Sequence, residues 1–234
     1  MARKAKSRQP ARSAAASGGS PREKIIEAFM TLLADHPIED IGLADIASEA
    51  DVTLSELRGE FGSPMAMLAA YIKDIDRKVL DGGDDDMEDE SPRERLFDVL
   101  MRRLELLEPH KPAIRSLIRS AMRNPPLALT LNAHSVCSQQ WMLTAAGIGA
   151  SGPKGMIRAQ GLALMFANVI RTWVNDHDEG HAKTLAALDR ELARGQRLVG
   201  LLDELCKIPE RARQFTRGGR RSRRDRDRDE HVSV

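Results

Sequence analysis

The chain has 234 residues, of which 41% are hydrophobic and only 3% aromatic, and its formal net charge is +1. A core short of aromatic residues must be built from Leu, Ile, Met and Ala, which favours packed helices over a β-sandwich or barrel, so we expect an all-α protein. No apolar run reaches the length of a membrane span and no secretion signal is evident, which indicates a cytoplasmic protein without a membrane partner. The two cysteines, Cys137 and Cys206, are too far apart in the sequence to suggest a disulfide framework.

The first segment, residues 1–19, is a basic arm. It holds five basic residues and no acidic one, and it has no apolar period, so we expect it to be disordered. A flexible basic arm beside a DNA-binding domain can lie along phosphates or enter the minor groove. A tail that serves only solubility is the alternative, and the sequence leaves both open.

A first amphipathic helix is expected to begin after Ser20. Ser20 and Glu23 have the spacing of a capping box, and Pro21 stands at the first helical position, where proline is favoured. Apolar side chains recur at helical spacing from Ile25 to Leu33, and the helix should end at His36.

Residues 43–61 predict a helix, a tight turn and a second short helix. Apolar side chains at helical spacing precede the turn, and Thr53 with Glu56 forms another capping box after it. Leu57 and Phe61 lie four residues apart on the second helix and should close a small core. The other side of this helix is then exposed, and in a helix-turn-helix that side enters the DNA major groove.

Several short patterns in this region occur together, in a fixed order. They are the D-I-A-x-x-A pattern, the valine of the turn and the sequence F-G-S, at Asp45, Ile46, Ala47, Ala50, Val52, Phe61, Gly62 and Ser63. With these patterns, residues 21–71 resemble the N-terminal domain of the TetR family of bacterial transcriptional regulators. The resemblance implies a helix-turn-helix domain that binds a palindromic operator in double-stranded DNA. The residues expected to face the DNA are Leu43, Ala44, Thr53, Leu54, Ser55, Glu56, Arg58 and Gly59.

The second helix departs from the family pattern in its charge. Family members commonly carry Lys or Arg near its start and a Lys just after the F-G-S, whereas this chain has Leu54 and Pro64 there. Glu56 and Glu60 add negative charge, which phosphate oxygens repel. We therefore expect DNA affinity to depend on Arg58, on hydroxyl groups of the second helix, on the first amides of the following helix and on the basic arm.

Composition divides the chain into further segments after the arm. Residues 20–80 hold the helix-turn-helix domain and a connecting helix, residues 81–90 form an acidic solvated loop, and residues 91–208 form a larger helical domain. We expect about nine helices in the two domains together. Residues 209–234 mix Arg with Asp and should be a disordered charged tail. Cation binding by the acidic loop is the weaker alternative because the regular ligand spacing of an EF-hand is missing, so no metal site is expected.

The last two expected helices, at about 154–175 and 183–206, carry apolar side chains at spacings of three and four. Such a stripe needs a facing helix. In TetR proteins the last two helices pair with their copies in a second subunit, so the resemblance implies a homodimer. The residues assigned to its interface are Val169, Trp173, Leu185, Leu188, Leu192, Val199 and Leu202. A hairpin buried within one chain is the competing interpretation.

The larger domain is also where the resemblance places a ligand. Soft methionine side chains suit a cavity that accepts variable apolar shapes, and an Arg or His could orient the ligand. The expected pocket residues are Met101, Leu104, Arg119, Met122, His134, Trp141, Met142 and Met165. For each of them, ordinary packing in the core is the alternative.

These features predict a homodimeric transcriptional regulator, expected to be a repressor, that releases its operator when a small apolar ligand binds. The alternative comes from residues 172–195, which are similar to the end of the ubiquinone-biosynthesis accessory proteins, which share the TetR fold but bind lipids instead of DNA. The sequence shows no phosphate-binding glycine loop, serine elbow or Cys/His pair, so we expect neither an enzyme nor a cofactor.

Overall fold

The computed structural model describes residues 19–83 and 89–197, and within these residues helices are the only regular secondary structure. In chain order the helices are α1 (Pro21–Asp35), α2 (Leu43–Glu49), α3 (Leu54–Glu60), α4 (Pro64–Asp81), α5 (Pro92–Leu107), α6 (Lys111–Arg123), α7 (Pro125–Ala145) and α8 (Gly152–Trp173), with short 3-10 turns η1 (Ile38–Asp40) and η3 (Glu108–His110). A further helix spans residues 182–197. The all-α class expected from composition is confirmed.

Local capping rules determine where several of these helices begin. At α1 the Glu23 N–H donates to Ser20 Oγ at 3.3 Å, and the Ser20 N–H donates to the Glu23 carboxylate at 2.8 Å. Ser91 and Glu94 repeat this exchange at the start of α5, with distances of 3.1 and 3.3 Å. Each exchange satisfies amides that have no partner inside the helix, so a few residues of sequence fix the helix boundary.

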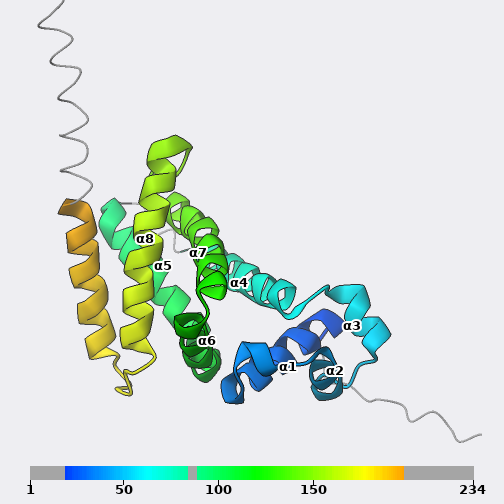
Figure 1. Ribbon diagram of the computed structural model, residues 1–234. Helices are drawn as coiled ribbons and strands as arrows, with labels where there is room; N and C mark the ends of the chain where they lie inside the picture. Colours follow the sequence, from blue (N-terminus) through cyan, green and yellow to red (C-terminus); the bar gives the residue numbers. More distant parts are fainter. Residues whose placement is uncertain (1–18, 84–88, 198–234) are drawn as a thin grey trace, which may run out of the picture.

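The molecule has a small head and a larger body (Figure 1). The head consists of α1, α2 and α3, and the body consists of α5 to α8 with the helix of residues 182–197. Helix α4 leads from the head into the body, where it packs against α5 and α7. Helix α1 packs against α6, so the head is attached to the body through a second contact besides α4.

Polar contacts reinforce the attachment of the head. His110 of η3 lies between the head and α4: its Nε2 is 3.2 Å from a carboxylate oxygen of Glu27, and its Nδ1 is 3.2 Å from the Tyr71 hydroxyl. Burial raises the pKa of Tyr71 above its ordinary value, which keeps that hydroxyl protonated. The Ser116 hydroxyl of α6 donates to the His36 carbonyl at the end of α1, at 3.0 Å. The orientation of the head is therefore tied to the η3–α6 segment.

Some predictions fall outside the described residues. These are the predictions for the basic arm up to residue 18, for the middle of the acidic loop, for the charged tail, and for Val199 and Leu202 at the expected interface. Among the helices of residues 19–83 and 89–197, none is long and apolar enough to cross a membrane. The same ranges hold no group of three or more His, Cys, Asp or Glu side chains arranged to bind a metal ion.

Candidate nucleic-acid interface

A tight turn places α2 and α3 over a shared core. Asp51 adopts the left-handed backbone conformation, with φ of 51°, which Asp tolerates better than most residues. The Val52 N–H then donates to the Ala47 carbonyl at 3.0 Å, closing the turn. Ile46 of α2 and Leu57 of α3 are buried in the core beneath it. Because Leu57 faces inward, the opposite side of α3 faces solvent.

The start of α3 is held by the predicted capping box. The Glu56 N–H donates to Thr53 Oγ1 at 3.2 Å, and the Glu56 carboxylate accepts from the Thr53 N–H at 2.7 Å and from its hydroxyl at 2.8 Å. These bonds, the backbone one first, hold the pKa of Glu56 below its ordinary value. Glu56 is therefore an anion that points back to the helix start, and both residues are engaged in capping.

All of the residues predicted to face DNA are exposed. They are Leu43, Ala44, Thr53, Leu54, Ser55, Glu56, Arg58 and Gly59. Leu54 is the most unusual of them, because 56% of this apolar residue is accessible to solvent. An added Cβ at Gly59 would meet no atom within 4 Å, so the surface beside Arg58 is open.

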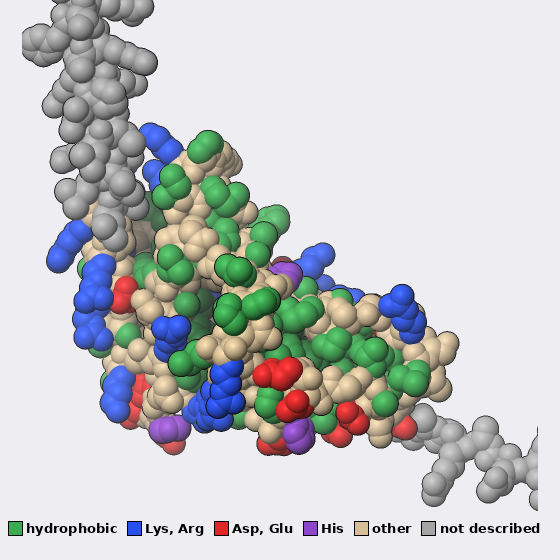
Figure 2. Space-filling view, in the orientation of Figure 1, with side chains coloured by type: hydrophobic (Ala, Val, Ile, Leu, Met, Phe, Trp, Pro, Cys, Tyr) green, Lys and Arg blue, Asp and Glu red, His purple; other side chains and the backbone are tan. Residues whose placement is uncertain are grey.

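The head carries a strong excess of negative charge. Residues 19–63 include ten acidic and three basic residues, which gives a formal charge of −7. Figure 2 shows acidic side chains gathered along the edge of the head that α1 and α2 form. Of the three cations, Arg22 lies over the Phe61 ring, with 4.8 Å between its guanidinium carbon and the ring centroid. Arg58 is thus the one basic side chain of α3, in an acidic neighbourhood.

The residues predicted for the dimer interface lie mostly inside the chain. Val169, Trp173 and Leu188 are fully buried, Leu192 is 6% exposed, and Leu185 is half-buried. The helix of residues 182–197 lies beside α8 (Figure 1). Burial within one chain agrees with the competing interpretation, a hairpin of the last two helices, and the assignment of these residues to a dimer interface stays a prediction.

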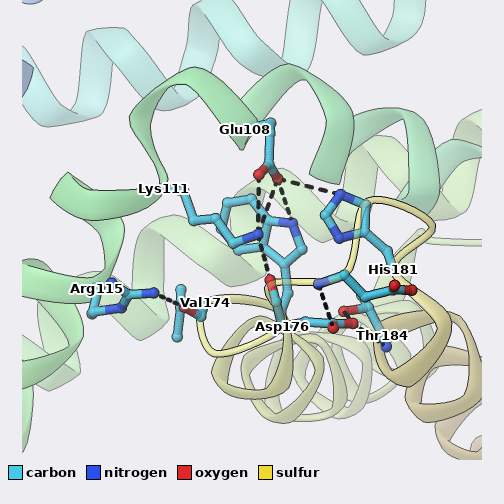
Figure 3. Close-up of polar contacts among 9 residues, drawn as sticks. Glu108, Lys111, Arg115, Val174, Asp176, His181 and Thr184 are labelled. Carbon is cyan, nitrogen blue, oxygen red and sulfur yellow. Dashed lines mark hydrogen bonds and ion pairs between the residues drawn. The ribbon is translucent and has the colours of Figure 1, made fainter.

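A polar network holds the end of α8 in place (Figure 3). The Glu108 carboxylate accepts from the Trp173 indole N–H at 3.0 Å and from Lys111 Nζ at 3.0 Å, and it lies 3.6 Å from His181 Nε2. Lys111 also donates to the Asp176 carbonyl at 2.9 Å, and Nζ stands 4.9 Å from the centroid of the Trp173 ring. These long-range partners bind the end of α8 to the η3–α6 segment, and the apolar periodicity gave no sign of them.

Asp176 holds the start of the following helix. Although Asp176 is only 1% exposed, its carboxylate accepts from the Thr184 hydroxyl at 2.8 Å and from the Thr184 N–H at 3.0 Å. The hydroxyl bond contributes most to holding the pKa of Asp176 below its ordinary value of 3.8, whereas burial acts in the opposite direction. The ionised carboxylate of Asp176 therefore stabilises the start of this helix.

The residues predicted to line a ligand pocket differ widely in their burial. Leu104, Met142 and Met165 are buried in the core, and Met101 and His134 are half-buried. Arg119, Met122 and Trp141 are exposed, at 74% for Met122 and 59% for Trp141. Core packing, the alternative left open for each residue, accounts for the buried members.

A buried ion pair in the body is formed by residues that the sequence did not single out. Arg103 of α5 pairs with Asp76 of α4 and is 6% exposed. Asp76 also accepts from the Ser138 hydroxyl of α7 at 2.6 Å, and the Arg103 guanidinium lies 5.8 Å from the centroid of the Phe166 ring of α8. Four helices thus meet at one buried ion pair, which links α4 to the body.

A hollow opens on the surface where α7 and α8 meet. It has a volume of about 720 Å³. Its lining residues are Gln140, Trp141, Thr144, Ala150, Ser151, Gly152, Pro153 and Met156. Of the residues predicted for a ligand pocket, Trp141 alone is part of this lining.

Solved structures with the same arrangement of helices are known. A TetR transcriptional regulator from Nitrosomonas europaea aligns with a TM-score of 0.61 at 21% identity, covering 76% of this chain and 99% of its own. A TetR transcriptional regulator from Rhodococcus sp. RHA1 aligns with a TM-score of 0.51 at 20% identity, covering 75% and 94% of the two chains. No protein-family model and no curated protein matches the sequence. The chain therefore has the fold of the TetR-type transcriptional regulators.

Proposed function

We propose that this protein is a DNA-binding transcriptional regulator of the TetR type. The observation that carries the proposal is the outward side of the capped helix-turn-helix, where the eight residues assigned to DNA contact from the sequence are all exposed at the start of α2, at the cap of α3 and along α3. The solved proteins of the same fold are described as transcriptional regulators. A rigid, exposed second helix is the element that such a head inserts into the major groove.

The side chains of α3 suit a small, specific set of base contacts. Arg58 can donate two bonds to a guanine edge, and the Ser55 hydroxyl can bond to either kind of base. The exposed apolar surface of Leu54 matches a thymine methyl group. Thr53 and Glu56 are occupied by capping, so their part is to hold the helix start rather than to contact bases.

Phosphate binding must come mainly from outside α3, because the head is acidic. The first amides of α4 form a helix N-terminus beside the end of α3, and backbone N–H groups there can bind a phosphate. Residues 1–19 add five basic side chains directly before α1. We propose that this basic arm supplies most of the electrostatic attraction, so affinity should fall steeply as salt rises.

Control of the operator would come through two copies and a ligand. Two heads in a homodimer would read half-sites about one turn of DNA apart. A small apolar ligand that binds one conformation of the body better than the other would shift the heads and release the operator, which makes the protein a repressor. The link from body to head on which this depends is α4, held by the Asp76–Arg103 pair.

A second function is favoured by the charge of the head. A formal charge of −7 over residues 19–63 repels DNA phosphates, whereas it does not oppose the binding of an apolar ligand by the helical body. This favours, as the alternative, a lipid-type or quinone-type ligand-binding accessory protein of the same fold that binds no specific DNA. Extraction of the purified protein into organic solvent followed by mass spectrometry tests it, and a stoichiometric apolar molecule would support this alternative.

The main test is selection of bound fragments from random double-stranded DNA by the full chain. A palindromic site should be enriched, and Arg58→Ala should weaken binding to it by about 10- to 100-fold, as loss of one bidentate base contact does. The matched control is Arg77→Ala, which removes an exposed arginine of α4 outside the α2–α3 turn. If both variants bind every sequence equally and weakly, the regulator proposal fails.

The basic arm is tested separately. Removing residues 1–18 should weaken binding to specific and unrelated DNA alike and should reduce the slope of log affinity against log salt by about 4.5, the value for five phosphate contacts. An unchanged salt slope would mean that the arm makes no phosphate contacts.

A further inference from the structure

The interior of the body contains two polar atoms that have no hydrogen-bond partner among the described residues. They are Nε of Arg103 on α5 and Oε1 of Gln139 on α7, in residues that are only 6% and 1% exposed. Two further unpartnered atoms, on Arg115 and His181, belong to half-buried side chains that lie closer to water. Buried polar atoms are nearly always paired, because leaving one unpaired costs stability. The two interior atoms therefore indicate a group that binds between the helices.

Both atoms belong to the layer in which four helices of the structure meet. Arg103 pairs with Asp76 of α4, and Asp76 accepts from the hydroxyl of Ser138, the residue directly before Gln139 on the buried side of α7. The Phe166 ring of α8 lies 5.8 Å from the Arg103 guanidinium. A molecule bound in this layer would touch α5, α7 and α8, and it would lie beside the ion pair that holds α4.

The chemistry of the two atoms defines the group that they can bind. The Arg103 N–H requires an acceptor, and the Gln139 oxygen requires a donor. Asp76 already neutralises Arg103, so a carboxylate would bring an unpaired negative charge into the interior, and it could not donate to Gln139. An ammonium group could not accept from Arg103. A hydroxyl group is neutral, accepts and donates, and so satisfies both atoms.

We infer that the body binds an apolar molecule that carries a hydroxyl group, with this hydroxyl accepting from Arg103 Nε and donating to Gln139 Oε1. The apolar part of the molecule packs among buried side chains of the same helices, where the flexible methionine can move to make room. These side chains are Leu100, Leu104, Met142 and Phe166. The inference rests on the proposed function, since it gives the chemical class of the ligand and places that ligand beside the Asp76–Arg103 pair of α4.

The test compares two probes that differ by one hydroxyl group. Isothermal titration calorimetry of the full chain should show that para-butylphenol binds at least about tenfold more tightly than butylbenzene, as a buried neutral hydrogen bond allows. Gln139→Met keeps the length of the side chain but removes the acceptor. Affinity for para-butylphenol should therefore fall about tenfold, whereas affinity for butylbenzene should not change.

The matched control is Gln140→Met, at the neighbouring glutamine, which lines the surface hollow between α7 and α8. It should leave the affinity for both probes unchanged. Thermal unfolding of the unliganded proteins provides a second readout. Gln139→Met should not lower the melting temperature, because the acceptor that it removes has no partner to lose.

Other results would overturn the inference. If neither probe binds, or if Gln139→Met binds para-butylphenol as tightly as the wild type, water alone satisfies the two atoms. Weaker binding in Gln140→Met instead would assign the probe to the surface hollow. Tighter binding of para-butylbenzoate than of para-butylphenol would contradict a neutral hydroxyl site.

Calorimetry needs no DNA, so this inference and the proposed regulator can fail separately. Hydroxyl-selective binding by a chain that enriches no DNA site would keep the inference and remove the regulator. A palindromic site enriched by a chain that does not distinguish the two probes would keep the regulator and remove the inference.

Discussion

The head and the body hold their charged residues in different ways. In the head, Glu23, Asp45 and Glu56 bond to the backbone three residues earlier, and the rest of the acidic excess lies on the surface. In the body, Arg103 and Glu108 are paired with groups far away in the sequence. Charge in the head therefore shapes helix ends and the potential that a DNA phosphate meets, whereas charge in the body fixes how helices pack. Substitutions should separate these two roles.

The largest effect is expected at the buried pair of the body. Asp76→Ala leaves the Arg103 guanidinium buried without its carboxylate and should lower the free energy of unfolding by about 3–5 kcal/mol. Urea denaturation followed by circular dichroism measures it. The matched control is the double variant Asp76→Leu/Arg103→Met, which removes both charges and should recover most of the loss. If the double variant is as unstable as the single one, the pairing is not the cause.

A smaller loss is expected where Trp173 anchors α8. Trp173→Phe keeps a large ring but removes the N–H that donates to Glu108, so the free energy of unfolding should fall by about 1–3 kcal/mol. Trp141→Phe is the matched control at an exposed tryptophan, and it should change the stability by less than about 0.5 kcal/mol. Equal effects at the two positions would contradict the assignment of Trp173 to the interior.

The third prediction concerns pH. The pKa of Asp176 is lowered in the folded protein, so its contribution to stability is present above its ordinary pKa of 3.8 and is lost as pH falls through the lowered value. Thr184→Val removes the hydroxyl donor that contributes most to the lowering. Acid unfolding of Thr184→Val should therefore begin at a higher pH than that of the wild type, as measured by circular dichroism during acid titration.

A matched threonine provides the control for the acid titration. Thr172→Val removes a hydroxyl that donates to the Asn168 carbonyl one turn earlier in α8 and has no carboxylate partner among the described contacts. Its acid transition should coincide with that of the wild type. A shift of the same size in both variants would point to a general loss of stability rather than to Asp176.

How much of this molecule can be predicted from the sequence depends on the range of the interaction. Residues within four positions of each other determine the capping boxes at Ser20 and Thr53 and the exposed side of α3. The helices of the head could therefore be predicted from the sequence. The apolar stripe containing Val169 and Leu188 predicted burial, but a stripe does not say whether its partner is the same chain or another. The Asp76–Arg103 pair spans 27 residues and has no local signature.

The same limit explains the pocket residues. Met122 and Met142 look alike in a sequence, yet one is 74% exposed and the other is fully buried. Helical spacing assigns side chains to faces of a helix but does not say which face the neighbouring helices cover. For this reason the side chains of α7 and α8 that face solvent could be identified only from the structure.

The smallest effect on stability is expected in the head, at the start of α3. Thr53→Ala removes the hydroxyl that accepts the Glu56 N–H, and loss of such a cap costs about 1 kcal/mol. Because the cap also positions Arg58 one turn later, DNA affinity should fall by more than the stability loss alone implies, as measured by titration of the selected site. Thr53→Ser keeps the hydroxyl and should restore both. If Thr53→Ala binds DNA as tightly as the wild type while losing stability, the cap serves the head's fold and not its contact with DNA.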